Sequence, residues 1–161
     1  MIDISQLEDF ARRCEAARAD LKPYAGKALE ETGEEFLTIV QMAIQELGNV
    51  DTGKLLASFT KGADGNIWEL NADGLTLTIG TNVEYAKWVD IGHRQTPGRF
   101  IPGYWDGKHF RYDPGAKTGM ILKASFAKGS HYFSRSVGTL RRMLPEMMET
   151  SFGQFFRRYF P

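Results

Sequence analysis

The sequence has one cysteine, no long apolar run and no net charge. Cys14 has no partner within the chain, so neither an internal disulfide nor a thiolate cluster for a metal can form. The apolar runs are only a few residues long, far short of the roughly 20 residues that span a bilayer. The opening MIDISQLEDF is acidic and lacks the apolar stretch of a secretory signal. These absences predict a protein of the cytoplasm, or one that is assembled there.

Apolar and aromatic residues are present in sufficient number to build one core, at 42% of the 161 residues. The charged residues are polarised along the chain, because residues 1–50 have a balance of −5 and residues 101–161 a balance of +6. Opposite charges of this kind can pair the two ends of one monomer or orient subunits in an assembly. Solvated faces without any such role are the simpler alternative.

Helical periodicity marks both ends of the chain. Ser5-Gln6-Leu7-Glu8 matches a capping box and starts a first helix, which the Lys22-Pro23 step should interrupt. A second helix is predicted from Tyr24 to Leu47, with Gly48-Asn49 as its C-terminal cap. Pro145 should kink the C-terminal helix or start a new one. That helix is predicted from the apolar positions Phe133, Val137, Leu140, Leu144 and Met147.

Between the helices, the hydrophobic period changes to that of strands. The segments Ile67–Leu70 and Leu75–Ile79 flank an Asp73-Gly74 turn and predict a β-hairpin. Residues 83–91 return to helical spacing, and Met120–Phe126 predicts a further strand.

Residues 92–119 are rich in glycine, proline, aromatic residues and cations, and predict a long ordered loop with a small hairpin at Asp106-Gly107. The predicted fold class is therefore α+β, with long N-terminal helices and a C-terminal helix packed on a small antiparallel β-sheet. We expect a single domain over residues 1–161, with a long inserted loop at about 94–119.

The segment GNVDTGKL, residues 48–55, contains the outlines of two enzyme motifs. A P-loop needs a preceding strand and Ser or Thr after its lysine, whereas here a predicted helix precedes and Leu55 follows Lys54. An aspartic protease needs Asp51-Thr52-Gly53 at the end of a buried strand and a second carboxylate to share the proton. The simpler interpretation is that Asp51 or Thr52 caps a short helix over residues 53–58. A protease using Asp51 and a nucleotide hydrolase using Lys54 stay open as alternative functions.

Other polar groups indicate no metal or cofactor site, since the histidines His93, His109 and His131 lie far apart in sequence. A nucleic-acid-binding module using the basic C-terminal half is another alternative. Its cations would be Lys117, Lys123, Lys128, Arg135, Arg141 and Arg142, although a solvated helix face is the more ordinary outcome. The aromatic tail, residues 155–160, is too apolar for a free end and should pack on its own core or on a neighbour.

Three sequence blocks, in order, resemble the small neck or tail-completion proteins of tailed phages. These blocks are VDTGKLLASF, LTIGTNVEYAKWVDIGH and GSHYFSRSV leading into a final helix. The chain departs from the family pattern at Asn49, where proline is usual, and at Asp90, where glutamate is usual; residues 94–129 look like an insertion. The matching residues are Val50, Asp51, Thr52, Gly53, Leu55, Gly80, Thr81, Tyr85, Ala86, Val89, Asp90 and Gly92.

This resemblance implies a non-enzymatic virion component at the head–tail junction, acting as one subunit of a ring around the DNA channel. Its partners would be the head connector or closure proteins and the tail-terminator or tail-tube proteins, with passive contact to DNA in the channel and no membrane. The protein would be assembled in the cytoplasm of the bacterial host and then reside in the virion.

The same interpretation assigns roles to particular residues. Asp51, Thr52, Gly53 and Leu55 should form a structural corner between helix and sheet. A helix that docks on the sheet should contain Tyr85, Ala86, Val89, Asp90 and Gly92. The candidate interface consists of aromatic residues and arginines of the loop and the tail: Arg99, Phe100, Tyr104, Trp105, Arg111, Phe155, Phe156, Arg157, Arg158, Tyr159 and Phe160.

Overall fold

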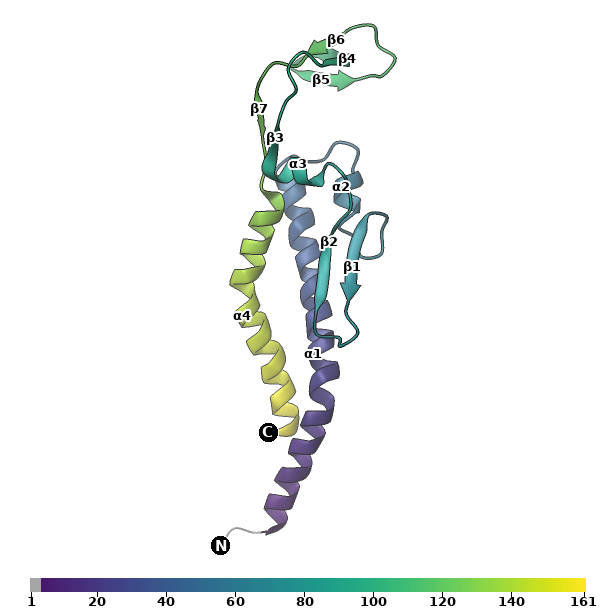
Figure 1. The fold of residues 1–161 in the computed structure, drawn as a ribbon. Helices are drawn as coiled ribbons and strands as arrows, with labels where there is room; N and C mark the ends of the chain where they lie inside the picture. The colour runs from purple at the N-terminus through teal and green to yellow at the C-terminus, as the bar shows by residue number, and fades with distance from the viewer. Residues whose placement is uncertain (1–3) are drawn as a thin grey trace. The chain divides into compact units, whose positions relative to one another are not determined.

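The computed structural model describes residues 4–161 and is α+β, as the sequence predicts (Figure 1). The chain forms two compact units. The helical unit contains the described residues up to Ala86 together with Tyr132–Pro161, and the β unit is Lys87–His131. The elements in chain order are α1 (Ile4–Glu46), α2 (Lys54–Ala57), β1 (Asn66–Leu70), β2 (Leu77–Thr81), α3 (Ala86–Ile91), β3 (Gly92–Arg94), β4 (Phe100–Asp106), β5 (His109–Tyr112), β6 (Gly119–Ile121), β7 (Phe126–Lys128) and α4 (Tyr132–Tyr159).

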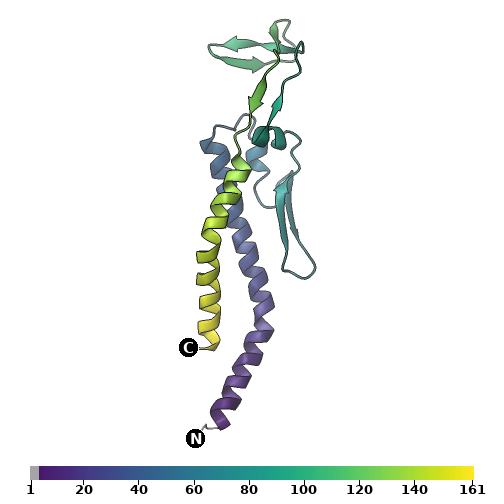
Figure 2. The ribbon, with the colours of Figure 1, turned by 60° about the vertical axis from the view of Figure 1, so that its left-hand side comes forward.

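The helical unit is built on an antiparallel pair of long helices, α1 and α4 (Figures 1 and 2). Each helix is amphipathic and buries its apolar stripe against the other. Near one end of the pair, the Phe36 and Phe133 rings pack edge-to-face with centroids 5.5 Å apart. Near the other end, the Tyr24 and Phe155 ring centroids lie 4.8 Å apart. Aromatic pairs at both ends thus fix the register of the two helices.

The prediction of two separate N-terminal helices is wrong, because α1 continues through Pro23 as one helix. Figure 2 shows it as a single curved helix. Proline removes one backbone hydrogen bond, but the next residue, Tyr24, packs against Phe155 and donates its hydroxyl to the Ser151 carbonyl over 2.8 Å. This packing against α4 outweighs the local preference. Ser5 already lies within the described helix, so it is not the predicted capping residue.

The prediction that Pro145 starts a new helix is also wrong, since α4 is continuous from Tyr132 to Tyr159. Pro145 and its neighbours are exposed. Water can therefore bind the backbone carbonyl that the proline leaves without a donor.

The predicted hairpin is confirmed as β1 and β2, which pair antiparallel with Trp68 opposite Ile79. Its second strand begins at Leu77 and ends at Thr81, two residues later at each end than predicted. The hairpin packs directly on α1 at Gly33. A Cβ atom at Gly33 would lie 2.5 Å from Leu77 Cδ2 and 2.7 Å from Trp68 Cη2. Glycine at this helix position therefore permits the close approach of the hairpin.

The β unit contains the predicted loop, which has more regular structure than expected. The hairpin at Asp106-Gly107 is confirmed as β4 and β5, and β6 pairs with the other edge of β4. A two-stranded ribbon of β3 and β7 lies between this sheet and the chain termini of the unit. The predicted single strand Met120–Phe126 is in fact two short strands, β6 and β7. The assignment of residues 1–161 to one domain stays a prediction.

Candidate interaction surfaces

The GNVDTGKL segment begins as the C-terminal cap of α1, as predicted. Gly48 has φ +67°, a left-handed conformation that glycine adopts without strain. The Gly48 N–H donates to the Gln45 carbonyl over 3.0 Å, and the Asn49 N–H donates to the Ile44 carbonyl over 2.9 Å. This pair of bonds is a Schellman motif, which satisfies two carbonyls at the helix end. A helix therefore precedes the segment, where a P-loop would have a strand.

The second half of the segment forms α2, but its cap differs from the prediction. Gly53, with φ +77°, occupies the N-cap position, and no side chain caps the helix. Capping by Asp51 or Thr52 is therefore wrong, although the Thr52 hydroxyl accepts a long bond of 3.4 Å from the Lys54 N–H. Leu55 is 2% exposed and anchors α2 in the core. The corner role of Asp51, Thr52, Gly53 and Leu55 stays a prediction.

A buried hydroxyl that the sequence analysis missed connects two of the sequence blocks. Ser58, at the end of α2, is fully buried and donates to the Leu55 carbonyl over 2.8 Å. The Thr81 hydroxyl, at the end of β2, donates to Ser58 Oγ over 2.8 Å. Asn66 Nδ2 donates to the Ser58 carbonyl over 3.0 Å. This network ties α2 to both strands of the hairpin. In the sequence, the only signal was a small polar residue within an apolar segment.

The segment around α3 buries only some of the residues predicted to dock, among them Ala86 and Gly92. Val83 and Ala86 are buried, Val89 and Asp90 are half-buried, and Tyr85 is 40% exposed. Tyr85 thus makes a poor docking residue, while the docking role of the segment stays a prediction.

Gly92 has a structural role within the β unit. It has φ +79°, and a Cβ atom there would lie 2.3 Å from the Ala127 carbonyl oxygen. Gly92 is therefore the residue that lets β3 begin in close contact with β7.

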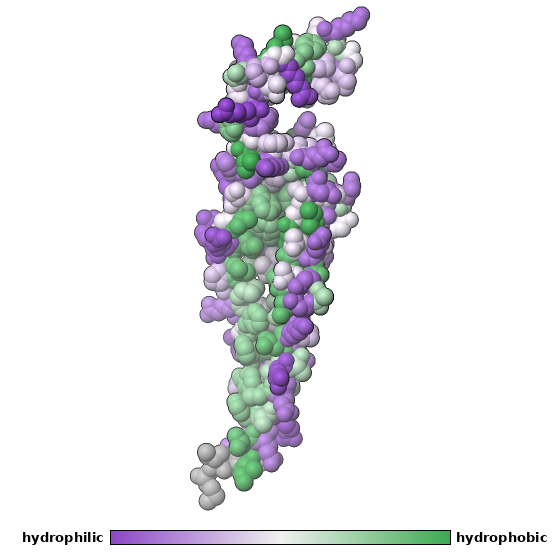
Figure 3. All heavy atoms as spheres, in the orientation of Figure 1, coloured by the Kyte–Doolittle hydropathy of each residue, from purple (hydrophilic) through white to green (hydrophobic). Residues whose placement is uncertain are grey.

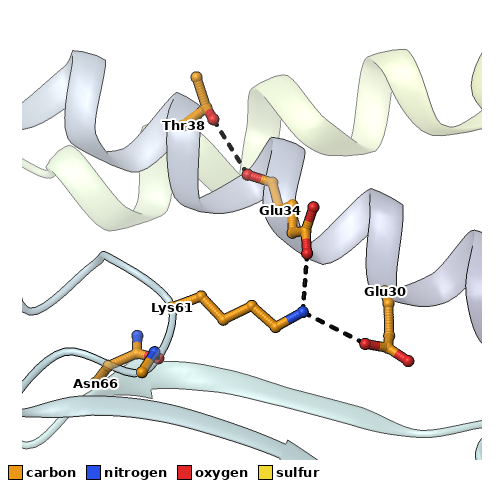
Figure 4. A network of polar contacts seen from close by, with 6 residues as sticks. Glu30, Glu34, Thr38, Lys61 and Asn66 are labelled. Carbon is orange, nitrogen blue, oxygen red and sulfur yellow. Dashed lines mark hydrogen bonds and ion pairs between the residues drawn. The ribbon is translucent and has the colours of Figure 1, made fainter.

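Lys61 connects the segment after α2 to the acidic face of α1 (Figure 4). Its ammonium lies 2.8 Å from a Glu34 carboxylate oxygen and 3.4 Å from a Glu30 oxygen. The same ammonium lies 4.3 Å from the Trp68 ring centroid of β1. The hydrogen bond to Glu34 is the main cause that raises the pKa of Lys61 above its ordinary value. Glu30 and Glu34 therefore already have a partner within the protein.

The C-terminal aromatic tail is divided between core and surface. Phe155 and Tyr159 are 3% and 9% exposed and pack with Ala17 of α1. These two residues therefore lie in the protein's own core, which is one of the two alternatives for the tail, and they leave a neighbouring subunit little surface to contact. The Tyr159 hydroxyl donates to the Asp20 carboxylate, and this hydrogen bond is the main cause that raises the pKa of Tyr159.

The remaining tail residues are more accessible. Phe156 is 49% exposed, and Arg157 and Arg158 are exposed beside it. Phe160 is half-buried, with its ring centroid 5.8 Å from that of Phe10. The interface prediction is therefore retained for Phe156, Arg157 and Arg158, and in part for Phe160.

The sheet β5-β4-β6 of the β unit has two different faces. Side chains alternate along a strand and share a face with their cross-strand partners. The register Trp105 opposite Phe110 and Ile101 opposite Met120 therefore places these four on one face, together with Tyr112. We call Ile101, Trp105, Phe110, Tyr112 and Met120 the aromatic face; none of these residues is charged.

The opposite face of the same sheet carries charged and polar residues. It contains Tyr104 opposite Arg111, and Asp106 opposite His109, along with Phe100. Large apolar side chains are exposed on both faces, with Trp105 59%, Tyr104 54% and Phe100 51% exposed. Several large exposed apolar side chains on one small sheet are typical of an interaction surface.

The two units also differ in charge. The β unit has eight Lys/Arg and three Asp/Glu, a balance of +5, and all three histidines. The remainder of the chain has 12 Lys/Arg and 17 Asp/Glu, a balance of −5. Within residues 4–161, no group of three or more His, Cys, Asp and Glu side chains is placed to bind a metal ion. No helix in this range is long and apolar enough to cross a membrane.

Comparison with known proteins identifies the family. Residues 8–92, which include most of α1, the corner, the hairpin and α3, match the family described as "Bacteriophage HK97-gp10, putative tail-component". The chain belongs to this family. The resemblance to phage joining proteins is thus confirmed, and the family is one of phage structural components. The family match ends at Gly92, where the β unit's first strand begins.

Two relatives from Bacillus subtilis (strain 168) extend the similarity beyond this range. The "Phage-like element PBSX protein XkdI" is 36% identical over 146 residues, covering 89% of this chain and 91% of the relative. The "Uncharacterized protein YqbI" is 34% identical over 165 residues, covering 98% and 99%. The similarity to the second relative therefore includes the β unit. No solved structure was found to match this chain.

Proposed function

We propose that this chain is a ring-forming subunit at the head–tail junction of a tailed phage or prophage, in the neck or in tail completion. The family match and the relative from a phage-like element support a structural role in a phage particle. The observation that carries the ring is the contrast between an acidic helical unit and a basic β unit with exposed aromatic residues. Two unlike surfaces on every copy favour heterologous contacts, which close into a ring when the rotation permits.

The proposal includes the partners of such a ring. The head connector or closure proteins would lie on one side and the tail-terminator or tail-tube proteins on the other, with passive DNA contact in the channel. The protein would assemble in the host cytoplasm and remain in the virion. Arg99, Phe100, Tyr104, Trp105 and Arg111 of the β unit are the first interface candidates, because the structure leaves all five exposed.

Two measurements test this function. Mass spectrometry and cryo-electron microscopy of purified particles should find the protein at the head–tail junction, in a ring with one defined copy number. Light scattering of the purified protein should show whether rings form before incorporation. Absence from the particles, together with a monomer at high concentration, would contradict the proposal.

DNA binding is a second candidate, favoured by the +5 balance and the exposed aromatic residues of the β unit. Cations neutralise phosphates and aromatic rings stack on bases. A purified protein that binds short DNA duplexes, with an affinity that falls steeply as salt rises, would support this role. Retention of affinity after replacement of Lys108 and Arg111 by glutamate would argue against it.

A further inference from the structure

The helical unit has an apolar groove that its own elements leave open. Its walls are β2 and α4 and its floor is α1, with Phe36, Leu77, Ile79, Phe133, Val137 and Leu140 among its lining residues. The groove has a volume of about 280 Å³ and no charged lining residue. Thr32, its hydroxyl-bearing residue, already donates to the Ala28 carbonyl over 2.8 Å. Figure 3 shows the apolar surface of this stretch between β2 and α4.

Because the groove lining offers no polar group that is free to bond, the groove favours an apolar occupant. A polar or charged side chain would lose its hydration in this groove without gaining a partner. An aromatic ring would bury a large apolar area at no such cost, provided that the N–H of a tryptophan keeps its hydration at the open side of the groove. The volume offers room for a large aromatic side chain and is too small to enclose a whole helix.

The aromatic face of the β unit is chemically matched to the groove. Trp105 is 59% exposed, and its ring packs edge-to-face against Phe110 with centroids 5.4 Å apart. The Phe110 ring covers Gly103, because a Cβ atom there would lie 2.7 Å from Phe110 Cζ. Phe110 therefore restrains the Trp105 ring, so that Trp105 loses little side-chain entropy when it binds.

The net charges of the two units indicate which units contact each other between copies. Two β units of +5 repel each other, and so do two helical units of −5, whereas a β unit and a helical unit attract. Contacts between two like units are thereby disfavoured, and contacts between a β unit and a helical unit are favoured. Repeated head to tail from copy to copy, such a contact closes into a ring, whereas a reciprocal exchange between two copies stops at a dimer.

We infer that the aromatic face of one copy docks on the helical unit of the next copy, with Trp105 in the apolar groove. This inference rests on the proposed function, because the repeated contact is the one that would build the ring. Trp105 then acts as the central anchor, and tryptophan is among the residues most enriched at such positions.

Cross-linking in assembled particles tests the contact. Lys108→Cys lies in the turn beside Trp105, and Thr78→Cys is the exposed position of β2 between two groove residues, in a Cys14→Ser background. Both positions leave the anchor and the groove lining intact. A short bis-maleimide reagent should give a ladder of covalent dimers and larger species of this chain on a denaturing gel.

Second-site variants in the cysteine background show whether the named residues make the contact. Trp105→Ser should lower the ladder at least tenfold, whereas Ile121→Ser, similarly exposed at 66% but on the opposite face, should leave it within twofold. Leu140→Lys, which places a charge in the groove, should also lower it tenfold. Leu144→Lys, one turn further along α4 and outside the groove lining, is the matched control.

Each other outcome overturns the inference. A cross-link within one chain only would mean that the β unit docks on its own helical unit. A cross-link only to another virion protein would mean that the aromatic face contacts that protein. An unchanged ladder in Trp105→Ser, with loss of DNA affinity, would assign the face to DNA. A protein present in particles without a ladder refutes this contact alone, whereas a protein absent from particles refutes the proposed function as well.

Discussion

The helical unit and the β unit differ in how they bury their large apolar side chains. In the helical unit, Val40, Ile44 and Phe59 are fully buried, and the hairpin and α4 cover α1 closely. In the β unit, the three-stranded sheet leaves large apolar side chains exposed on both faces. A small sheet without a covering layer has little core of its own. The comparison therefore separates residues that stabilise the fold from residues that are available to partners.

The largest effect on this comparison is expected from the adjacent pair Phe155 and Phe156. Phe155→Ala removes a ring that is 3% exposed and should lower the free energy of unfolding by about 3–5 kcal/mol. Phe156→Ala removes a ring that is 49% exposed and should change it by less than about 0.5 kcal/mol. Urea unfolding followed by circular dichroism measures both. Equal losses in the two variants would refute the division of the tail into core and surface.

Two helical glycines should respond oppositely to alanine. Gly33→Ala places a methyl group against Leu77, Trp68 and Ile79, and should cost about 1–3 kcal/mol of unfolding free energy. Gly138→Ala in α4 meets no atom within 4 Å and should stabilise by about 0.5–1 kcal/mol through helix propensity. The same urea titration measures both variants. Stabilisation by Gly33→Ala would show that the hairpin does not rest closely on α1.

Hydrogen exchange should reveal the difference in local stability between the units. Backbone amides of β4 to β6 in the unassembled protein should exchange faster than those of α1 around Val40 and Ile44, because fewer buried contacts oppose local opening. Exchange monitored by mass spectrometry on peptides of each unit measures this directly. Assembled rings should slow exchange in the β unit and in β2 beside the groove. Equal protection of both units in the monomer would contradict the comparison.

The smallest expected effect is on the melting temperature at alkaline pH. The hydrogen bond to Asp20 raises the pKa of Tyr159 in the folded protein, so the neutral phenol contributes stability that is fully present below pH about 10. This contribution should be lost as pH rises above that value and through the folded pKa. Tyr159→Phe and Asp20→Asn should each make the alkaline fall in melting temperature shallower. A fall identical to that of the unaltered protein in both variants would show that this bond contributes nothing.

The candidate site could be predicted from the sequence only in part. The Gly48-Asn49 cap, the hairpin turn at Asp73-Gly74 and the turn at Asp106-Gly107 are local features, and the structure confirms them because nearby residues decide them. The interruption at Pro23 and the new helix at Pro145 were wrong, because packing along the helix pair and exposure to water outweigh local preference. The partition of Phe155 and Phe156 depends on which side of α4 faces α1, which the tail's composition alone does not show.

The sequence by itself determined many of the elements and the chemistry: amphipathic helical segments at both ends, a hairpin between them, a basic aromatic segment and the blocks that mark a phage structural family. Only the tertiary structure decided that residues 87–131 form a unit of their own, that Trp105 and Tyr104 lie on opposite faces of its sheet, and that an apolar groove remains open beside α4. The physical reason is the range of the interactions. Caps, turns and periodicity act within a few residues, whereas burial depends on segments such as α1 and α4 that meet from opposite ends of the chain.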